Sequence, residues 1–390
     1  MIPIGAVDGE RADQPTDRPA AWLDALCVGE TMVMVTPTPG GRLDAGSTFV
    51  LRAGGAESNV AMFLAALGHR VGWAGRVGAD PLGDLVVEQV RGTGVDTSLV
   101  EVDQARPTAV YLKDPGPDGT RVYYYRRGSA AAGMDPEYAD RIDAVPATVL
   151  HLSGVTPALS DSCRALVDHL VGFRPAGRGL VSFDVNHRPA LWSDRSAAAT
   201  ELLRLAQAAD VVFVGLDEAA RLWDVTTPEQ VRALVDRPAA LVVKNGAVEA
   251  VTFTADGVTV VPARPVEVVE PVGAGDAFAA GWLSGALRGL DQTARLRLGH
   301  LVAGAALGSV SDFAALPPVP AICAALEIPP DSWHAAAGPS AGMAAGRSAG
   351  MAAGRSAGSP SAGMVAGRSA GMAAGFPADT AAGGSAAAKG

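Results

Sequence analysis

Short apolar segments alternate along this chain with segments in which apolar residues recur every three or four positions. The first pattern predicts strands and the second predicts amphipathic helices. Because the strands are apolar at consecutive positions, we expect a parallel sheet covered by helices on both faces. The expected strands are 25–35, 71–77, 148–152, 180–185, 211–214 and 240–243, and the expected helices are 57–67, 82–92, 160–170, 198–209 and 217–222. The pattern predicts an α/β fold with a doubly wound, mainly parallel sheet.

Residues 95–134 interrupt this alternation, because they read as strands and turns without a helix. The alternating runs 108–113 and 121–127 flank a turn, 114–119, that is rich in Pro and Gly, which is typical of a hairpin. A second strand-rich piece lies at about 32–52. We expect the two pieces to form a small β lid at the edge of the sheet, and a homo-oligomer formed through this lid is a further hypothesis.

Both ends of the chain are expected to lie outside the folded domain, which we place at 23–330. Residues 1–22 are polar and contain Pro, without the apolar core of a signal peptide, and are expected to be a disordered extension. Residues 335–390 repeat Ser-Ala-Gly-Met-Ala-Ala-Gly-Arg with variations. Such a sequence has few large apolar side chains to offset the entropy lost on ordering, so we expect a disordered low-complexity tail.

The net charge and the cysteine content limit the kinds of binding partner and the compartment that we expect for this protein. The net charge of −10 argues against binding to nucleic acid or to an acidic membrane. No apolar stretch free of charged residues and glycine breaks is long enough for a membrane span. The three cysteines are widely spaced, which argues against a disulfide framework or a zinc site and favours a reducing compartment. We therefore expect a cytoplasmic protein that binds small molecules.

A glycine-rich turn, 270–278, opens a long apolar helix. Gly273 and Gly275 allow close approach to a ligand, and the free N–H groups of a helix N-terminus favour an anion. Asp276, in the same turn, is interpreted either as an N-cap or as a base beside a transferring phosphoryl group. Polar clusters at 54–59, 184–188 and 244–246 follow other expected elements of the sheet. Because ligands of open α/β sheets bind beyond the carboxyl ends of the strands, these clusters favour the base.

Three pieces of the chain resemble the ribokinase-like (pfkB) sugar kinases: the pair Gly54-Gly55 with Asn59, the segment 75–83, and the signature 271–278. They occur in the family's order across roughly 25–317. The segments 123–129, 151–159 and 182–192 are most similar to 2-keto-3-deoxygluconate kinases. The resemblance implies transfer of the γ-phosphate of ATP to the 6-hydroxyl group of 2-keto-3-deoxygluconate. A pfkB-type kinase for fructose, ribose or a related sugar acid, or a catalytically weak sugar-binding homologue, remains an alternative.

The resemblance also implies roles for residues at matching positions. Asp276 would be the general base, and the backbone N–H groups of Gly273, Ala274 and Gly275 would form the anion hole. The nucleotide would be bound by Lys244, Asn245 and Gly246 together with Gly273 and Gly275. The substrate would contact Gly54, Gly55, Asn59, Tyr111, Tyr124, Arg126, Arg188 and Asp276. Because guanidinium groups bind carboxylates bidentately, the arginines favour a sugar acid over a neutral sugar.

Three positions depart from the family pattern. The resemblance implies ATP and Mg²⁺ as cofactors, with a monovalent cation as a further candidate. Glu270 stands where the family usually has Asp, and this exchange could alter where Mg²⁺ or the monovalent cation is placed. The family's Asn-x-x-Glu motif reads Gly215-Leu216-Asp217-Glu218, so Glu218 is the expected Mg²⁺ contact, through water. The segment 309–317, with Asp312 expected near the adenine, lacks the usual glycine.

Overall fold

A computed structural model of the chain describes residues 22–38, 43–44, 46–116, 119–175 and 178–334. The expected N-terminal extension, apart from Trp22, and the expected tail 335–390 lie outside the described residues. The structural description below therefore concerns the segment between them.

The main sheet has eight strands in the order β14-β13-β12-β11-β10-β9-β1-β4. The strands from β12 to β4 run parallel to one another, whereas β13 and β14 are antiparallel additions at one edge. Every residue of β9 is buried, as expected for a parallel strand covered on both faces. The strands are β1 (Leu23–Val28), β4 (Val71–Ala74), β9 (Ala147–Ser153), β10 (Arg178–Asp184), β11 (Val211–Gly215), β12 (Ala240–Asn245), β13 (Glu249–Thr254) and β14 (Gly257–Pro262).

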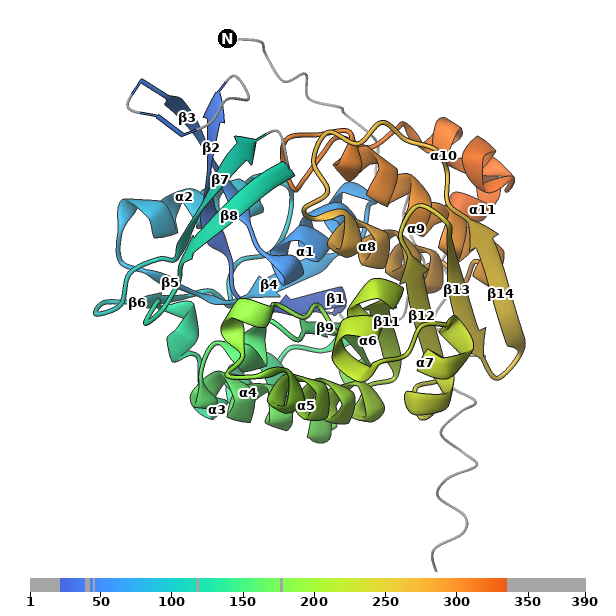
Figure 1. The fold of residues 1–390 in the computed structure, drawn as a ribbon, viewed down its shortest axis with the longest axis horizontal. Helices are drawn as coiled ribbons and strands as arrows, with labels where there is room; N and C mark the ends of the chain where they lie inside the picture. Colours follow the sequence, from blue (N-terminus) through green and yellow to red (C-terminus); the bar gives the residue numbers. More distant parts are fainter. Residues whose placement is uncertain (1–21, 39–42, 45, 117–118, 176–177, 335–390) are drawn as a thin grey trace, which may run out of the picture. The chain divides into compact units, whose positions relative to one another are not determined.

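Helices cover both faces of this sheet (Figure 1). On one side lie α3 (Pro136–Asp143), α4 (Asp161–Gly172), α5 (Arg195–Ala208), α6 (Leu216–Trp223) and α7 (Pro228–Leu234). On the other lie α1 (Ala56–Ala66), α8 (Ala274–Leu287), α9 (Gln292–Leu307), α10 (Val319–Leu326) and α11 (Pro330–His334), while α2 (Pro81–Gly92) packs near the lid. This arrangement confirms the predicted α/β, doubly wound, mainly parallel fold.

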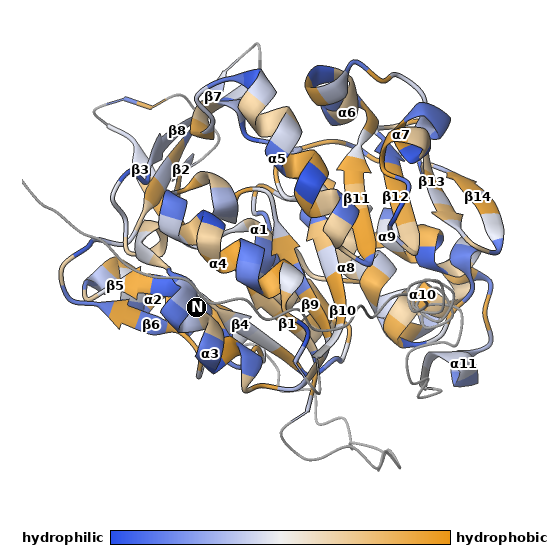
Figure 2. Cartoon of the chain, turned by 90° about the horizontal axis from the view of Figure 1, so that it is seen from below, coloured by the Kyte–Doolittle hydropathy of each residue, from blue (hydrophilic) through white to orange (hydrophobic). Residues whose placement is uncertain are grey.

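The side chains of each strand alternate between two hydrophobic cores. In β1, Ala25 and Cys27 belong to the core under α1, α8 and α9, whereas Leu26 and Val28 belong to the core under α4 and α5. Figure 2 shows the apolar strands beneath helices α4 and α5, which also carry hydrophilic residues. The sheet is thus held from both faces, and the strand ends are free to carry polar side chains.

A second sheet of four strands forms the lid, in the order β3-β2-β7-β8. Its strands are β2 (Met32–Thr38), β3 (Thr48–Gly54), β7 (Val110–Gly116) and β8 (Gly119–Tyr125). The strands of the predicted hairpin, β7 and β8, pair antiparallel, and β2 joins β7 in parallel. The two strand-rich pieces of the sequence therefore meet in one sheet, as expected.

Two expected strands are each divided at a glycine. The segment predicted as 25–35 leaves the main sheet at Gly29 and continues as β2 of the lid, and the segment 71–77 divides at Gly75 into β4 and β5 (Arg76–Gly78). A Cβ atom on Gly75 would lie 2.7 Å from the carbonyl oxygen of Gly29, so the two glycines allow the backbones to cross closely. Apolar residues resume at Met32 and at Val77, within three residues of each glycine, which is why periodicity alone did not reveal the breaks.

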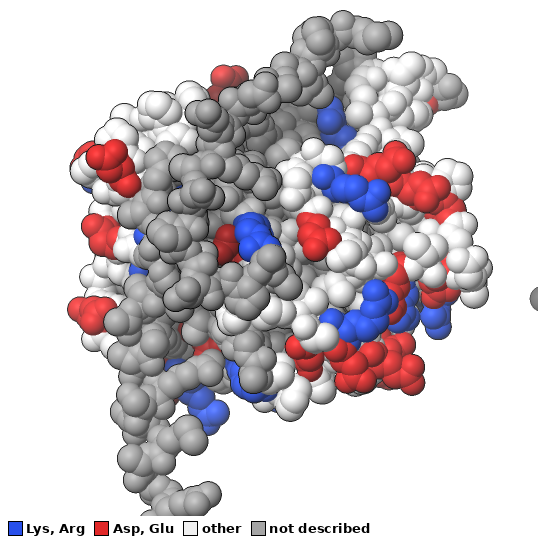
Figure 3. Space-filling view, turned by 180° about the vertical axis from the view of Figure 1, so that it is seen from behind, with Lys and Arg blue, Asp and Glu red and all other residues white. Residues whose placement is uncertain are grey.

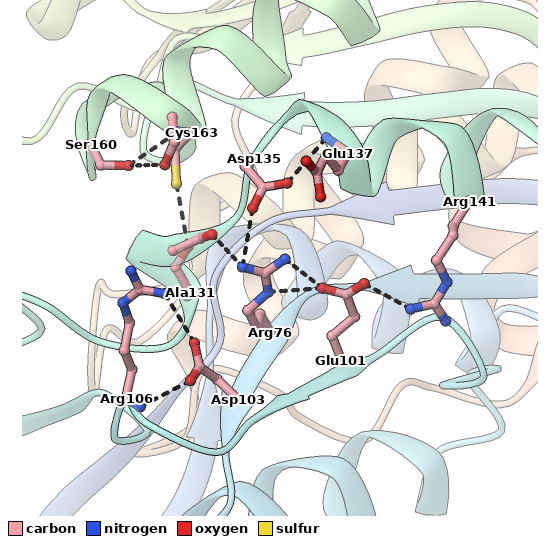
Figure 4. Close-up of polar contacts among 12 residues, drawn as sticks. Arg76, Glu101, Asp103, Arg106, Ala131, Asp135, Glu137, Arg141, Ser160 and Cys163 are labelled. Atoms are coloured by element: carbon pink, nitrogen blue, oxygen red, sulfur yellow. Dashed lines mark hydrogen bonds and ion pairs between the residues drawn. The ribbon is translucent and has the colours of Figure 1, made fainter.

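Strand β5 pairs with β6 (Glu101–Asp103) in a small separate sheet that is fastened by ion pairs (Figure 4). The guanidinium of Arg76 lies 2.6 Å from Glu101, whose other carboxylate oxygen accepts a hydrogen bond of 2.8 Å from Arg141 of α3. Arg106 pairs with Asp103 at 3.1 Å. These charges neutralise one another, so we assign this cluster to the attachment of α3 rather than to a ligand.

The visible described surface in Figure 3 intersperses Lys and Arg with Asp and Glu, without one large basic patch. Among the described helices, none combines the length and apolar character that crossing a membrane requires.

Candidate active site

One pocket collects residues from the lid, the N-terminus of α1, the loop after β10 and the turn before α8. It is lined by every residue expected to contact the substrate, namely Gly54, Gly55, Asn59, Tyr111, Tyr124, Arg126, Arg188 and Asp276, together with Gly273 of the expected anion hole. In the sequence these positions extend from Gly54 to Asp276, a span of more than two hundred residues. The fold therefore brings together in space the residues that the sequence grouped by resemblance alone.

Asp276 is the third residue of α8, and its carboxylate is held by two amides. The Nδ2 group of Asn59 donates a hydrogen bond of 2.9 Å to Oδ2, and that of Asn186 donates one of 3.1 Å to Oδ1. The N-cap of α8 is Gly273, without a side-chain cap. The alternative that Asp276 caps the helix is therefore wrong, because its side chain points into the pocket instead of onto the backbone of its own first turn.

Burial raises the pKa of Asp276 to about 7. The hydrogen bond from Asn59 lowers the pKa, the nearby charge of Asp184 raises it, and the cations of Arg188 and Lys244 lower it. A carboxyl group that titrates near neutral pH can both accept and release a proton under physiological conditions. The environment of Asp276 is thus suited to a general base.

The turn before α8 brings Gly273 to the same pocket, whereas Ala274, whose N–H group donates a hydrogen bond of 3.4 Å to Pro271, and Gly275 do not line it. Gly273 has a φ of +84°, and Ala274 and Gly275 are the first two residues of the helix, whose N–H groups lack partners within the helix. A Cβ atom on Gly273 would lie 3.0 Å from Cβ of Asp312, so glycine is required both for the backbone angle and for space. Such a turn can hold an anion at the helix N-terminus.

Lys244, at the end of β12, provides a cation beside this turn. Its Nζ atom lies 3.4 Å from the position that a Cβ on Gly275 would occupy and donates a hydrogen bond of 2.9 Å to Asp184. Burial alone would lower the pKa of Lys244, but the charges of Asp184 and Glu218 raise it overall, so the ammonium group stays charged. Asn245, the last residue of β12, and Gly246, on the turn after it, were expected beside the nucleotide and do not line the pocket.

Glu218 lies in the first turn of α6 and is held by the backbone. Its carboxylate accepts hydrogen bonds from the N–H groups of His187 and, at 3.2 Å, Gly215. Burial raises its pKa, and the charge of Asp184 adds to the effect. Within the described part of the chain, Oδ1 of Asp184 is buried and has no hydrogen-bond partner. An orphaned carboxylate oxygen beside a second carboxylate fits the oxygen-rich surroundings that Mg²⁺ and its bound water prefer.

The two arginines expected to recognise an acid differ in their partners. Arg126 is bound to Glu30, with a distance of 2.8 Å from Nε to Oε2, and its guanidinium lies 5.3 Å from the centre of the Tyr124 ring. Arg188, in contrast, donates only to the carbonyl oxygen of its neighbour His187, and no carboxylate of the described residues pairs with it. Arg188 is therefore the guanidinium with charge available to a ligand.

Several residues of the site were missed by sequence reasoning. Asn186 falls in the polar cluster 184–188 but was not singled out; in the structure its backbone has a φ of +40° and its amide donates a hydrogen bond to Asp276. Glu30 and Lys113 carried no motif. The contacts of Asp312 with Tyr111 and Lys113 of the lid were also not expected, and its place near the adenine stays a prediction. The signal for Asn186 was its place after β10, whereas the lid contacts are not readable from spacing.

Comparison with known proteins places this geometry in context. Residues 23–317 match the pfkB family of carbohydrate kinases. The chain is 36% identical over 303 residues to a 2-dehydro-3-deoxygluconokinase of Bacillus subtilis, which covers 76% of this chain and 93% of that protein. It is 33% identical to the enzyme of that name from Thermoproteus tenax, over 79% and 95% of the two chains. A PfkB protein of Polaromonas superposes with a TM-score of 0.69 at 34% identity, covering 74% of this chain and 97% of that one.

Proposed function

The chain belongs to the pfkB family of carbohydrate kinases, and from this premise we propose that it transfers the γ-phosphate of ATP to the 6-hydroxyl group of 2-keto-3-deoxygluconate. The observation that carries the proposal is the pocket in which the Asp276 carboxylate and the uncommitted guanidinium of Arg188 face the same space. The first supplies the base for a sugar hydroxyl, and the second supplies a partner for a sugar carboxylate.

In this proposal Asp276 takes the proton of the hydroxyl group as its oxygen attacks the γ-phosphorus. Asn59 and Asn186 fix the carboxylate, and their own carbonyl oxygens, which are buried and have no partner among the described residues, are available to substrate hydroxyl groups. The N–H groups of Gly273, Ala274 and Gly275 stabilise negative charge on the transferring group. Phosphoryl transfer depends mainly on such positioning and electrostatic stabilisation.

Mg²⁺ would be held through water by Asp184 and Glu218, whose carboxylates adjoin Lys244. When bound, the ion neutralises charge on the phosphate oxygens of ATP. Lys244 itself places a fixed positive charge beside the turn that opens α8. Asn245 and Gly246, the two residues that follow this lysine, remain proposed contacts of the nucleotide.

Arg188 distinguishes the proposed sugar acid from the neutral sugars that remain the alternative. We expect Arg188→Met to lower kcat/KM for 2-keto-3-deoxygluconate about 10- to 100-fold, because a charged hydrogen bond to the carboxylate is lost. The activity on fructose or ribose, where the wild type has any, should fall much less at pH 8 to 9, where loss of the Arg188 charge, which raises the pKa of Asp276, has the least effect. The measurement is ADP release coupled to a spectroscopic signal, with Mg-ATP and each sugar in turn.

The matched control is Arg195→Met, which removes a guanidinium that pairs with Asp224 on the surface. This variant should retain wild-type kinetics. Turnover by the wild type of neutral sugars alone would reject the sugar acid and keep the kinase. Absence of turnover on every sugar would instead favour the catalytically weak sugar-binding homologue.

We further propose that the lid forms the contact of a homo-oligomer. The face of the lid away from Tyr111 and Tyr124 exposes Phe49 by 45%, Tyr123 by 44% and Tyr125 by 65%. Apolar side chains gathered on one sheet face are typical of a protein interface. Light scattering should give a mass above that of one chain, and Tyr125→Glu should lower it. A monomeric wild type at tens of micromolar would reject this contact.

The cytoplasm is retained as the proposed compartment. The three cysteines of the chain are free and buried, as is usual where thiols are kept reduced.

A further inference from the structure

A lysine of the lid is buried between two carboxylates that flank the catalytic turn. Lys113 of β7 is only 1% exposed, and its Nζ atom lies 2.8 Å from Oδ1 of Asp312 and 3.5 Å from Oε2 of Glu270. Two residues earlier on the same face of β7, the hydroxyl of Tyr111 donates a hydrogen bond of 2.8 Å to the other oxygen of Asp312. The lid thus satisfies both oxygens of this carboxylate.

The same carboxylates are in direct contact with the turn that opens α8. Oε1 of Glu270 accepts a hydrogen bond of 3.2 Å from the N–H group of Val272, and the backbone of Asp312 packs against Gly273. Removal of the cation would leave two buried negative charges beside one another, which is costly in a protein interior. The position of the turn therefore depends on a positive charge at the location of Nζ.

A monovalent cation bound at Glu270 does not fit this arrangement. An ammonium group is close to potassium in size and charge, and that of Lys113 already lies between the two carboxylates. The ammonium group of Lys113 contacts both carboxylates, and Tyr111 donates a hydrogen bond to Asp312. Neither carboxylate therefore remains unpaired to bind a further ion.

We propose that Lys113 is a positioning residue that replaces a monovalent cation beside the catalytic turn, so that this kinase works without potassium. The part of the proposal that concerns turnover rests on the proposed sugar kinase activity. The replacement of the cation itself rests only on the contacts among Lys113, Glu270 and Asp312.

The test compares wild type and Lys113→Met in potassium chloride and in choline chloride at equal ionic strength. The wild type should show the same melting temperature and the same kcat in both salts. In choline, Lys113→Met should lose about 10²-fold in kcat, because the turn is displaced. Saturating potassium should restore much of that loss and raise the melting temperature of this variant by about 3 °C, since an ion that binds the folded state alone stabilises it.

A second variant separates replacement of the ion from simple damage. In Lys113→Met with Glu270→Gln, one positive and one negative charge are removed together, so the cluster keeps its net charge and the response to potassium should disappear. The surface variant Arg195→Met should respond to neither salt. A wild type that melts higher or turns over several-fold faster in potassium, or a Lys113→Met protein whose melting temperature ignores potassium, would overturn the proposal. If no sugar is phosphorylated at all, the proposed activity fails, and the melting temperatures still decide the role of Lys113.

Discussion

Asp276→Asn is expected to lower kcat for sugar phosphorylation by about 10²- to 10⁴-fold, the range that a positioned general base contributes. The amide keeps the size of the side chain but cannot accept the proton of the attacking hydroxyl. The KM values for sugar and ATP should change much less, because the pocket and the turn before α8 are preserved. Steady-state kinetics with Mg-ATP and the sugar acid measure both parameters.

The pH dependence gives an independent check of the same assignment. Because burial raises the pKa of Asp276 to about 7, the base of the free enzyme is protonated below that pH, so kcat/KM of the wild type should rise with pH through about 7. The residual activity of Asp276→Asn should lack this rise. An identical profile in both proteins would assign the titration to another group and contradict the assignment of the base.

Loss of folding should not explain the effect of this substitution. A carboxyl group whose pKa is higher in the folded than in the unfolded state costs stability at a pH above both values, and a neutral amide removes that cost. The amide introduced at this position can be accommodated because Oδ1 of Asn59 and of Asn186 has no partner among the described residues, so that one of these amides can turn to accept from it. At pH 8 the variant should melt no lower than the wild type.

Gly273→Ala is expected to lower kcat by about 10²- to 10³-fold, the loss seen when one donor of an anion hole is removed. The native φ of +84° is strained for any residue with a Cβ, and the new methyl group would meet Asp312 at 3.0 Å. The turn must move, and in the proposed mechanism its N–H groups would then no longer point to the transferring phosphoryl group. Single-turnover kinetics with saturating ATP would show the loss in the chemical step.

Gly94→Ala is the matched control for this substitution. Gly94 also has a positive φ, of +92°, but a Cβ there would have no neighbour within 4 Å. The control should show the backbone cost as a lower melting temperature while kcat stays near that of the wild type. Equal losses of kcat in both variants would mean that general destabilisation, and not the position of the turn, limits the reaction.

The sequence predicted the architecture because the main strands lie in uninterrupted apolar runs and the helices repeat at their own period. It also located Asp276 and Gly273, since the turn before α8 carries its chemistry within nine consecutive residues. Periodicity did not reveal the breaks at Gly29 and Gly75, because apolar residues resume in the next element within three positions.

Contacts between distant segments were not predictable in the same way. The partner of Arg126 is Glu30, 96 residues earlier, and that of Lys113 is Asp312, 199 residues later. Nothing in either local sequence indicates the other. The binding of Arg126 by Glu30 changes the interpretation of the site, because an arginine expected to meet the substrate already has a carboxylate partner.

The strand order of the main sheet also has a consequence for biosynthesis. Apart from β4 and β1, which exchange places, the strands from one edge to the other follow their order in the chain, ending with β12, β13 and β14. A polypeptide emerging from the ribosome can therefore add each new strand to the edge just completed, without opening a pair already formed. The hydrogen bond between Asn59 and Asp276 nevertheless cannot form until Asp276 has been synthesised, 217 residues later. The scaffold can thus grow during translation, whereas the reactive centre is assembled only near its end.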